Sequence, residues 1–156
     1  MELETLMNDF AAKVGLDELK PDNEGVYSIA FDNIAVAFME DKENERMIVY
    51  APIAQKPAEG ADKLAETLLA TNYIFEATNG ATIALNLEEG AYVLQNSYDL
   101  IRLDIEEFLS KIEAFVNKAE DLRNLIEDFR PVAEATIAEA EESFAEMNEA
   151  EDFIRV

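Results

Sequence analysis

The longest regular pattern in the sequence is an amphipathic stripe in its last third. Apolar residues recur at helical spacing from Ile105 to Phe129, and this period predicts a long helix with one apolar face. Asp104 precedes the stripe and Glu107 follows it by three residues, which is the spacing of a helix N-cap. An isolated helix cannot bury such a face, so the rest of the chain must form a layer that covers it.

Two shorter helices are predicted upstream. Between Leu3 and Val14 the apolar residues share one helical face, and Gly15 stands where a left-handed cap would end the helix. Residues 61–72 follow a break that contains proline and glycine, and they place their leucines on one side. Pro131 is predicted to end or redirect the long third helix.

Alternating apolar residues predict strands between these helices. Residues 27–31, 34–39 and 47–53 have a period of two and are expected to form a three-stranded meander. Pro52 suggests that the end of the third strand lies at an edge, because proline cannot donate a ladder hydrogen bond.

A second group of two to three strands follows the middle helix. Residues 73–77, 81–87 and 92–95 are apolar runs separated by turn residues, and Asn79-Gly80 favours a type I′ turn. The sequence therefore predicts an α+β protein with a twisted antiparallel sheet flanked by helices. The expected order is helix, three strands, helix, two to three strands, long helix.

The chain is predicted to contain one domain and an extension. Residues 1–130 hold all the elements above without a flexible linker, so they form a single α+β domain. Residues 131–156 form an acidic C-terminal helical extension with eight acidic residues against one arginine. Its apolar stripe is narrow and rich in alanine, so we expect a helix that docks weakly or serves a partner.

The first group of strands is apolar on both faces. Ile34–Met39 and Met47–Tyr50 contain more apolar side chains than a half-exposed antiparallel sheet needs. Either helices cover both faces of the sheet, or one face receives a partner. Because two-layer domains bury their sheets against helices, coverage by the first and third helices is the favoured interpretation.

The composition restricts the possible partners and reactions. The formal net charge is −23, and the chain has no cysteine and no histidine. Such a charge repels nucleic acid and anionic membranes, while it attracts a basic protein or keeps a poorly soluble one dispersed. Equally, it could serve only the solubility of the protein itself. The N-terminus lacks a signal sequence and no stretch could span a membrane, so a cytoplasmic protein is expected.

No constellation for catalysis or metal binding stands out. An acid-pair hydrolase would need two carboxylates such as Glu76, Asp99 or Asp104, yet N-capping explains Asp104 more simply. Residues 22–25 match a calcium loop only in part, and lysine and arginine interrupt the acidic cluster at 40–46. The prediction is a protein without enzymatic activity, metal or cofactor.

Between residues 68 and 126 the sequence resembles the type III secretion chaperones of the Tir chaperone class. The order of helices and strands agrees with that family over about residues 3–129. The stretches that carry the resemblance are Leu68–Tyr73, Thr78–Asn86, Glu89–Gly90, Val93–Gln95, Leu103–Phe108 and Phe115–Arg123. Two departures are Asn79, where a glycine pair is expected, and Leu122, where the family has a tryptophan. Nothing carries over to the extension after Pro131.

The resemblance implies an acidic homodimer in the bacterial cytoplasm. It would bind the N-terminal segment of a secreted effector in extended, non-globular form, keep it soluble and export-competent, and deliver it to the secretion apparatus. The positions that this implies for effector binding are Leu6, Phe10, Tyr27, Val36, Phe38, Met47 and Val49. The positions that it implies for the dimer contact are Leu64, Leu68, Leu69, Tyr73 and Phe75. The alternatives are a related regulatory protein-binding module outside secretion and, less favoured, the acid-pair hydrolase.

Overall fold

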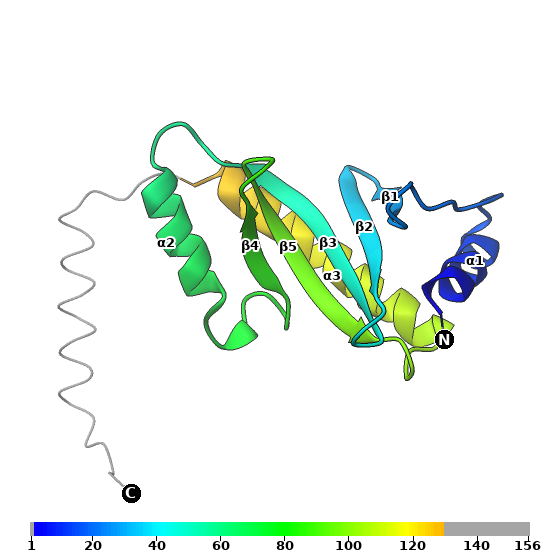
Figure 1. The fold of residues 1–156 in the computed structure, drawn as a ribbon. Helices are drawn as coiled ribbons and strands as arrows, with labels where there is room; N and C mark the ends of the chain where they lie inside the picture. Colours follow the sequence, from blue (N-terminus) through cyan, green and yellow to red (C-terminus); the bar gives the residue numbers. More distant parts are fainter. Residues whose placement is uncertain (1, 130–156) are drawn as a thin grey trace, which may run out of the picture.

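A five-stranded sheet lies across one long helix in the computed structural model, which describes residues 2–129 (Figure 1). The elements in chain order are α1 (Leu3–Val14), β1 (Tyr27–Phe31), β2 (Ile34–Asp41), β3 (Arg46–Gln55), α2 (Ala61–Thr71), the short 3₁₀ helix η1 (Tyr73–Phe75), β4 (Thr82–Asn86), β5 (Ala91–Asp99) and α3 (Ile105–Glu127). The strand order is β1-β2-β3-β5-β4, and every neighbouring pair is antiparallel. The predicted α+β fold class is confirmed, and the extension at 131–156 lies outside the described residues.

The helix predictions agree with the structure. The Asp104 side chain accepts a hydrogen bond of 2.8 Å from the backbone N–H of Glu107, so the N-cap of α3 is confirmed. Gly15 follows α1 with φ of 75°, a left-handed conformation that glycine adopts without steric cost. No helix within residues 2–129 is long and apolar enough to cross a membrane.

The strand predicted at 73–77 is wrong. Tyr73–Phe75 form η1, and the second group therefore has two strands, β4 and β5. Ile74 and Phe75 have φ of 51° and 60°, in the left-handed region that apolar side chains rarely occupy. Extended structure is interrupted here because the chain must reverse between the end of α2 and the start of β4.

Pro52 lies at a free edge, as predicted for the end of its strand. Its strand, β3, lies in the middle of the sheet between β2 and β5. Pairing with β2, however, stops at Tyr50, and from Ala51 onward β3 pairs with β5 alone. Pro52 thus lies in the part of β3 that faces no strand on its β2 side, next to a register shift at Ala54.

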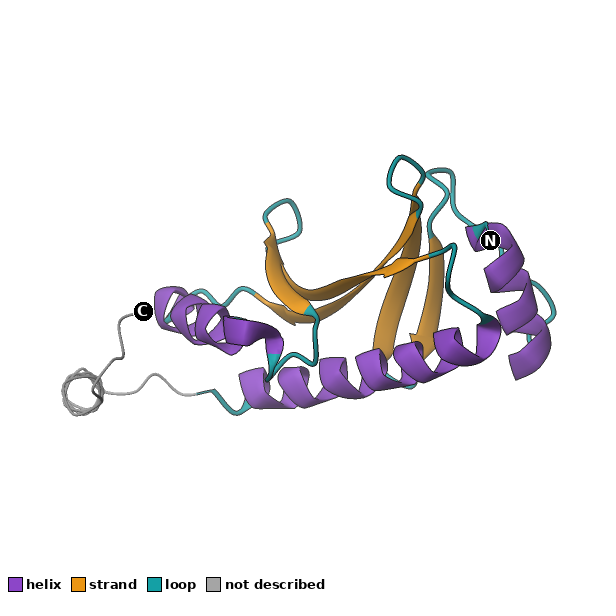
Figure 2. Ribbon diagram, turned by 90° about the horizontal axis from the view of Figure 1, so that it is seen from below, coloured by secondary structure: helices purple, strands orange, loops and turns teal. Residues whose placement is uncertain are grey.

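Helices cover only one face of the sheet. α1 and α3 lie on the same side, as Figure 2 shows. α3 packs on β2 and β3, α1 packs against α3, and their buried side chains form one core with those of the strands. The opposite face carries alternate residues of the same strands, such as Ala35, Met39 and Ile48, and no helix in the described part of the chain lies over it. The favoured interpretation, coverage by the first and third helices, therefore holds for the buried face, and the other face is uncovered within residues 2–129.

Candidate partner-binding site

A groove opens where α1, the edge strand β1 and α3 meet. We call it the α1–α3 groove, and its volume is about 310 Å³. The residues that line it are Phe10, Val14, Phe31, Asp32, Leu109, Ile112, Glu113, Val116 and Asn117. Most of these side chains are apolar, so the groove suits an apolar side chain of another molecule.

Aromatic rings in tilted and edge-to-face contact support the floor of this groove. The ring of Phe10 lies 6.2 Å from that of Phe31 and 5.5 Å from that of Phe108, measured between centroids. Phe108 in turn contacts Phe38 of β2 at 5.9 Å. Because this chain of rings continues into the core, the groove has a rigid base that needs little ordering when a partner binds.

The edge of β1 beside the groove is open. β1 is the first strand of the sheet, and its only strand neighbour among residues 2–129 is β2. An exposed edge offers unpaired N–H and C=O groups to an incoming strand. Phe31 belongs to β1 and lines the groove, so a strand added there would bring alternate side chains toward the same hollow.

The other edge of the sheet, β4, is partly closed by a side chain. The Nδ2–H of Asn72 donates to the carbonyl oxygen of Ile83 at 3.0 Å, and the N–H of Ile83 donates to the Oδ1 of Asn72 at 2.8 Å. The amide of Asn72 thus occupies both outward backbone groups of Ile83, as a neighbouring strand would. The two edges of the sheet therefore differ in their capacity for strand addition.

Replacing Asn72 with alanine should open the β4 edge. We expect the amide hydrogen of Ile83 to exchange about tenfold faster or more, since two hydrogen bonds worth roughly 0.5–1.5 kcal/mol each are lost. Hydrogen exchange followed by NMR measures the exchange rate of the Ile83 amide hydrogen. Asn86→Ala is the matched control, because Asn86 lies at the other end of β4 and bonds only the following turn, at Glu88 and Glu89. Unchanged protection of Ile83 in Asn72→Ala would contradict this role.

A family model matches residues 5–123, and its description is the Tir chaperone protein (CesT) family. The chain belongs to this family. The match covers every helix and strand described above except the first two residues of α1 and the end of α3. The resemblance drawn from the sequence is therefore confirmed, and a chaperone family is established. Comparison with curated protein sequences gives no match.

Solved structures share this Tir chaperone fold. A chain of the ExsC-ExsE complex is 23% identical with a TM-score of 0.69, covering 80% of this chain and 96% of that one. A chain of the HopA1-SchA chaperone-effector complex is 18% identical with a TM-score of 0.67, covering 78% and 92%. The complex of the Yersinia pestis type III secretion chaperone SycH with a stable fragment of YscM2 contains a chain that is 17% identical, with a TM-score of 0.59 and coverage of 76% and 98%. At these identities the likeness concerns the fold.

The seven positions expected to bind an effector lie in the core of this Tir chaperone family member. They are Leu6, Phe10, Tyr27, Val36, Phe38, Met47 and Val49, and each is at most 5% exposed. Phe10 alone among them lines the α1–α3 groove. Leu6 and Phe10 belong to α1, and the other five project from the sheet face that α1 and α3 cover. A contact of these residues with an effector stays a prediction.

The five positions expected at the dimer contact divide into two groups. Leu64 and Leu68 are buried within the protomer, at 2% and 3% exposed. Leu69, Tyr73 and Phe75 are exposed at 69%, 75% and 54%. Ile74 lies between them and is also exposed, although the sequence interpretation omitted it. We call these four exposed residues, Leu69, Tyr73, Ile74 and Phe75, the α2–η1 patch.

Several groove residues were not singled out from the sequence. Val14, Phe31, Leu109 and Val116 line the α1–α3 groove, and they lie at the margins of the apolar stripes rather than at their centres. A signal was present for two of them: Val14 ends the first helical stripe, and Phe31 shares its strand face with Tyr27. The centre of a stripe becomes core, whereas its margin stays accessible between elements.

The carboxylates considered for chemistry have structural roles or are exposed. Asp104 caps α3, and the Asp99 side chain accepts from the N–H of Ile101 at 2.9 Å. Asp22 accepts from the N–H groups of Glu24 and Val26 at 2.9 Å each, which closes the turn that partly matches a calcium loop. Residues 2–129 contain no group of three or more acidic residues arranged to hold a metal ion. Nothing in this geometry favours the hydrolase or the calcium site.

Proposed function

We propose that this protein is a type III secretion chaperone that binds the N-terminal segment of a secreted effector in extended, non-globular form. Membership of the Tir chaperone family supports this, and so does the shared fold with a chain of the HopA1-SchA chaperone-effector complex. The observation that carries the proposal is the open β1 edge beside an apolar groove, while the β4 edge is closed at Ile83. An extended segment finds main-chain partners and a side-chain pocket in one place.

The same proposal covers the setting in which the protein works. The chaperone acts in the cytoplasm, catalyses no reaction, and hands the effector to the secretion apparatus. Its charge of −23 keeps the complex with an unfolded segment soluble. The protein works as a homodimer, and the α2–η1 patch is the surface that we assign to the contact because it leaves four large apolar side chains in solvent.

Two exposed residues at the end of α1 provide a matched test. Val14 and Leu16 are 48% and 43% exposed, but only Val14 lines the α1–α3 groove. Val14→Asp should weaken binding of the effector's N-terminal segment by about tenfold or more, because it places a charge in an apolar pocket. Leu16→Asp should change the dissociation constant by less than about twofold, since it adds the same charge outside the groove.

The measurement is calorimetric titration of the isolated N-terminal segment of a co-encoded secreted protein into each variant. Narrow amide dispersion in the NMR spectrum of the bound segment would confirm a non-globular ligand. An equal loss of affinity in both variants would remove the groove from the proposal. A folded partner, or one that is never secreted, would favour the alternative of a regulatory module outside secretion.

A further inference from the structure

A second hollow lies on the opposite flank of α3. The groove residues Leu109, Glu113 and Val116 face α1, whereas Lys111 and Lys118 face β5 and the turn before β4. This second hollow, which we call the α3–β5 cleft, has a volume of about 290 Å³. The lining residues that matter below are Asn79, Asn96, Tyr98, Lys111, Phe115 and Lys118.

The charge of this cleft is opposite to that of the protein. Two lysines and no carboxylate line it, although acidic residues outnumber basic ones by 35 to 12 in the chain. The α1–α3 groove, in contrast, includes Asp32 and Glu113. A further hollow near the N-terminus includes Glu2, Glu4, Glu40 and Glu45 against one lysine. Two ammonium groups thus line the α3–β5 cleft of a strongly acidic protein, and the carboxylates that pair with them do not line it.

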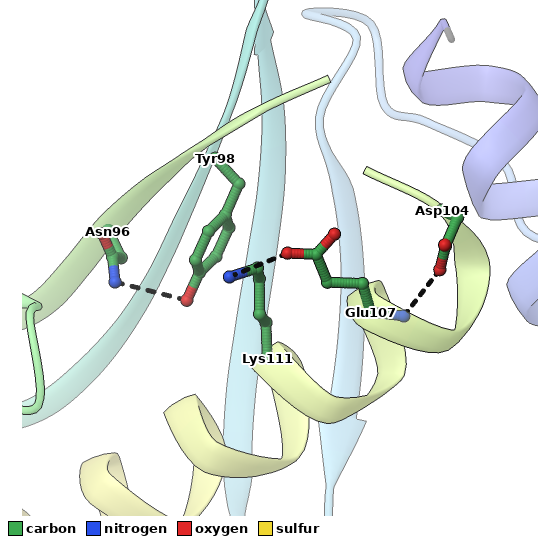
Figure 3. A network of polar contacts seen from close by, with 5 residues as sticks. All are labelled: Asn96, Tyr98, Asp104, Glu107 and Lys111. Carbon is green, nitrogen blue, oxygen red and sulfur yellow. Dashed lines mark hydrogen bonds and ion pairs between the residues drawn. The ribbon is translucent and has the colours of Figure 1, made fainter. Parts of the chain in front are cut away.

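Three polar side chains of the cleft, Asn96, Tyr98 and Lys111, lie together in Figure 3. The Nδ2–H of Asn96 donates to the Tyr98 hydroxyl oxygen at 3.3 Å, which leaves the hydroxyl hydrogen available. Within residues 2–129 the structure gives that hydrogen no acceptor. The ammonium group of Lys111 lies 5.4 Å from the centre of the Tyr98 ring and 3.2 Å from Glu107, which is outside the cleft. Lys118 pairs with Asp121 at 3.7 Å, also outside it.

Tyr98 is suited to donate at neutral pH. Its burial raises the pKa of the phenol above the usual value of 10, and the hydrogen bond from Asn96 opposes this only in part. The phenol therefore keeps its proton over the physiological range. The ammonium of Lys111 over the ring also holds the lysine side chain at the cleft by a cation–π contact.

We infer that the α3–β5 cleft binds the carboxylate of an aspartate or glutamate side chain from a partner polypeptide. The two ammonium groups supply the charge, and the Tyr98 hydroxyl supplies a directed donor. The buried ring of Phe115 offers an apolar surface to the methylene groups that precede the carboxylate. The cleft is separate from the α1–α3 groove, so this inference does not depend on the proposed function.

The test is an NMR titration with N-acetyl-glutamate N-methylamide, using the matched glutamine compound as the neutral probe. We expect saturable shifts at Asn79, Asn96 and Tyr98 with a dissociation constant on the order of millimolar for the glutamate probe. The glutamine probe should bind at least about tenfold more weakly, since it lacks the charge. Equal shifts from the two probes would overturn the inference. Acetate binding as tightly as the glutamate probe would also overturn the assignment to a side chain.

Variants separate the cleft from the general charge of the protein. Lys111→Gln combined with Lys118→Gln should abolish the shifts, and Tyr98→Phe should weaken binding about threefold or more because it removes only the donor. Lys20→Gln combined with Lys42→Gln makes the same change of charge outside the cleft and should leave the titration unchanged. An equal loss in that control pair would show simple charge attraction and overturn the inference.

Discussion

Replacing Phe108 with alanine should lower the free energy of unfolding by about 3–5 kcal/mol, the usual cost of removing a buried phenylalanine side chain. Phe108 is fully buried, at 0% exposed. Its ring contacts those of Phe10 and Phe38, so one side chain joins α1, β2 and α3. A cavity at this place would also remove the support beneath the α1–α3 groove. The expected loss is a large fraction of the free energy of unfolding, which is about 5–15 kcal/mol for a typical domain.

Urea unfolding followed by circular dichroism measures the change. Leu125→Ala is the matched control, because Leu125 lies on the same helix but is 47% exposed. The control should lose less than about 0.5 kcal/mol, as surface substitutions usually do. If both variants lost the same stability, the packing of α3 on the sheet would differ from the one described.

Placing aspartate at Leu69 and Tyr73 together should convert the proposed homodimer into a monomer at micromolar concentration. Both side chains are mostly exposed in the single chain, and burying two new carboxylates in an apolar contact is costly. We expect the dimer dissociation constant to rise at least about a hundredfold, as for central residues of an interface. Sedimentation equilibrium over a range of concentrations gives this constant directly.

Leu87→Asp is the control for this prediction. Leu87 is 81% exposed and lies just after β4, outside the α2–η1 patch, so it should leave the dimer constant unchanged. A wild-type protein that stayed monomeric at every concentration would contradict the proposed contact. The strained backbone at Ile74 and Phe75 fits a contact role, because an unfavourable conformation persists where surrounding structure or function maintains it.

Much of the fold could be predicted because its signals are local. The N-cap at Asp104, the glycine after α1 and the apolar stripe of α3 each depend on residues a few positions apart. The strand predicted at 73–77 failed for a reason that no local pattern contains. The side-chain amide of Asn72 hydrogen-bonds the backbone of Ile83, eleven positions later in the chain. This amide occupies the place beside β4 where a further strand would otherwise pair.

The candidate site was harder to predict than the fold. The residues named for effector binding, such as Phe38 and Met47, have the alternation expected of one strand face, and this face became the core. Periodicity separates the two faces of a strand, but it does not say which face a helix covers. The groove residues Val14 and Phe31 lie where three elements meet, so their accessibility depends on how those elements pack.

The sequence by itself determined the helices, most of the strands, the lack of cysteine and histidine chemistry, and the resemblance to the Tir chaperone family. These follow from composition and from neighbours along the chain. Only the tertiary structure decided that α1 and α3 cover the same face of the sheet. It also decided that the β1 edge is open, whereas the side chain of Asn72 closes the β4 edge at Ile83. Finally, it brought two lysines of α3 and Tyr98 into one cleft. Burial and edge exposure are properties of contacts between distant segments, so they arise only when the elements pack together.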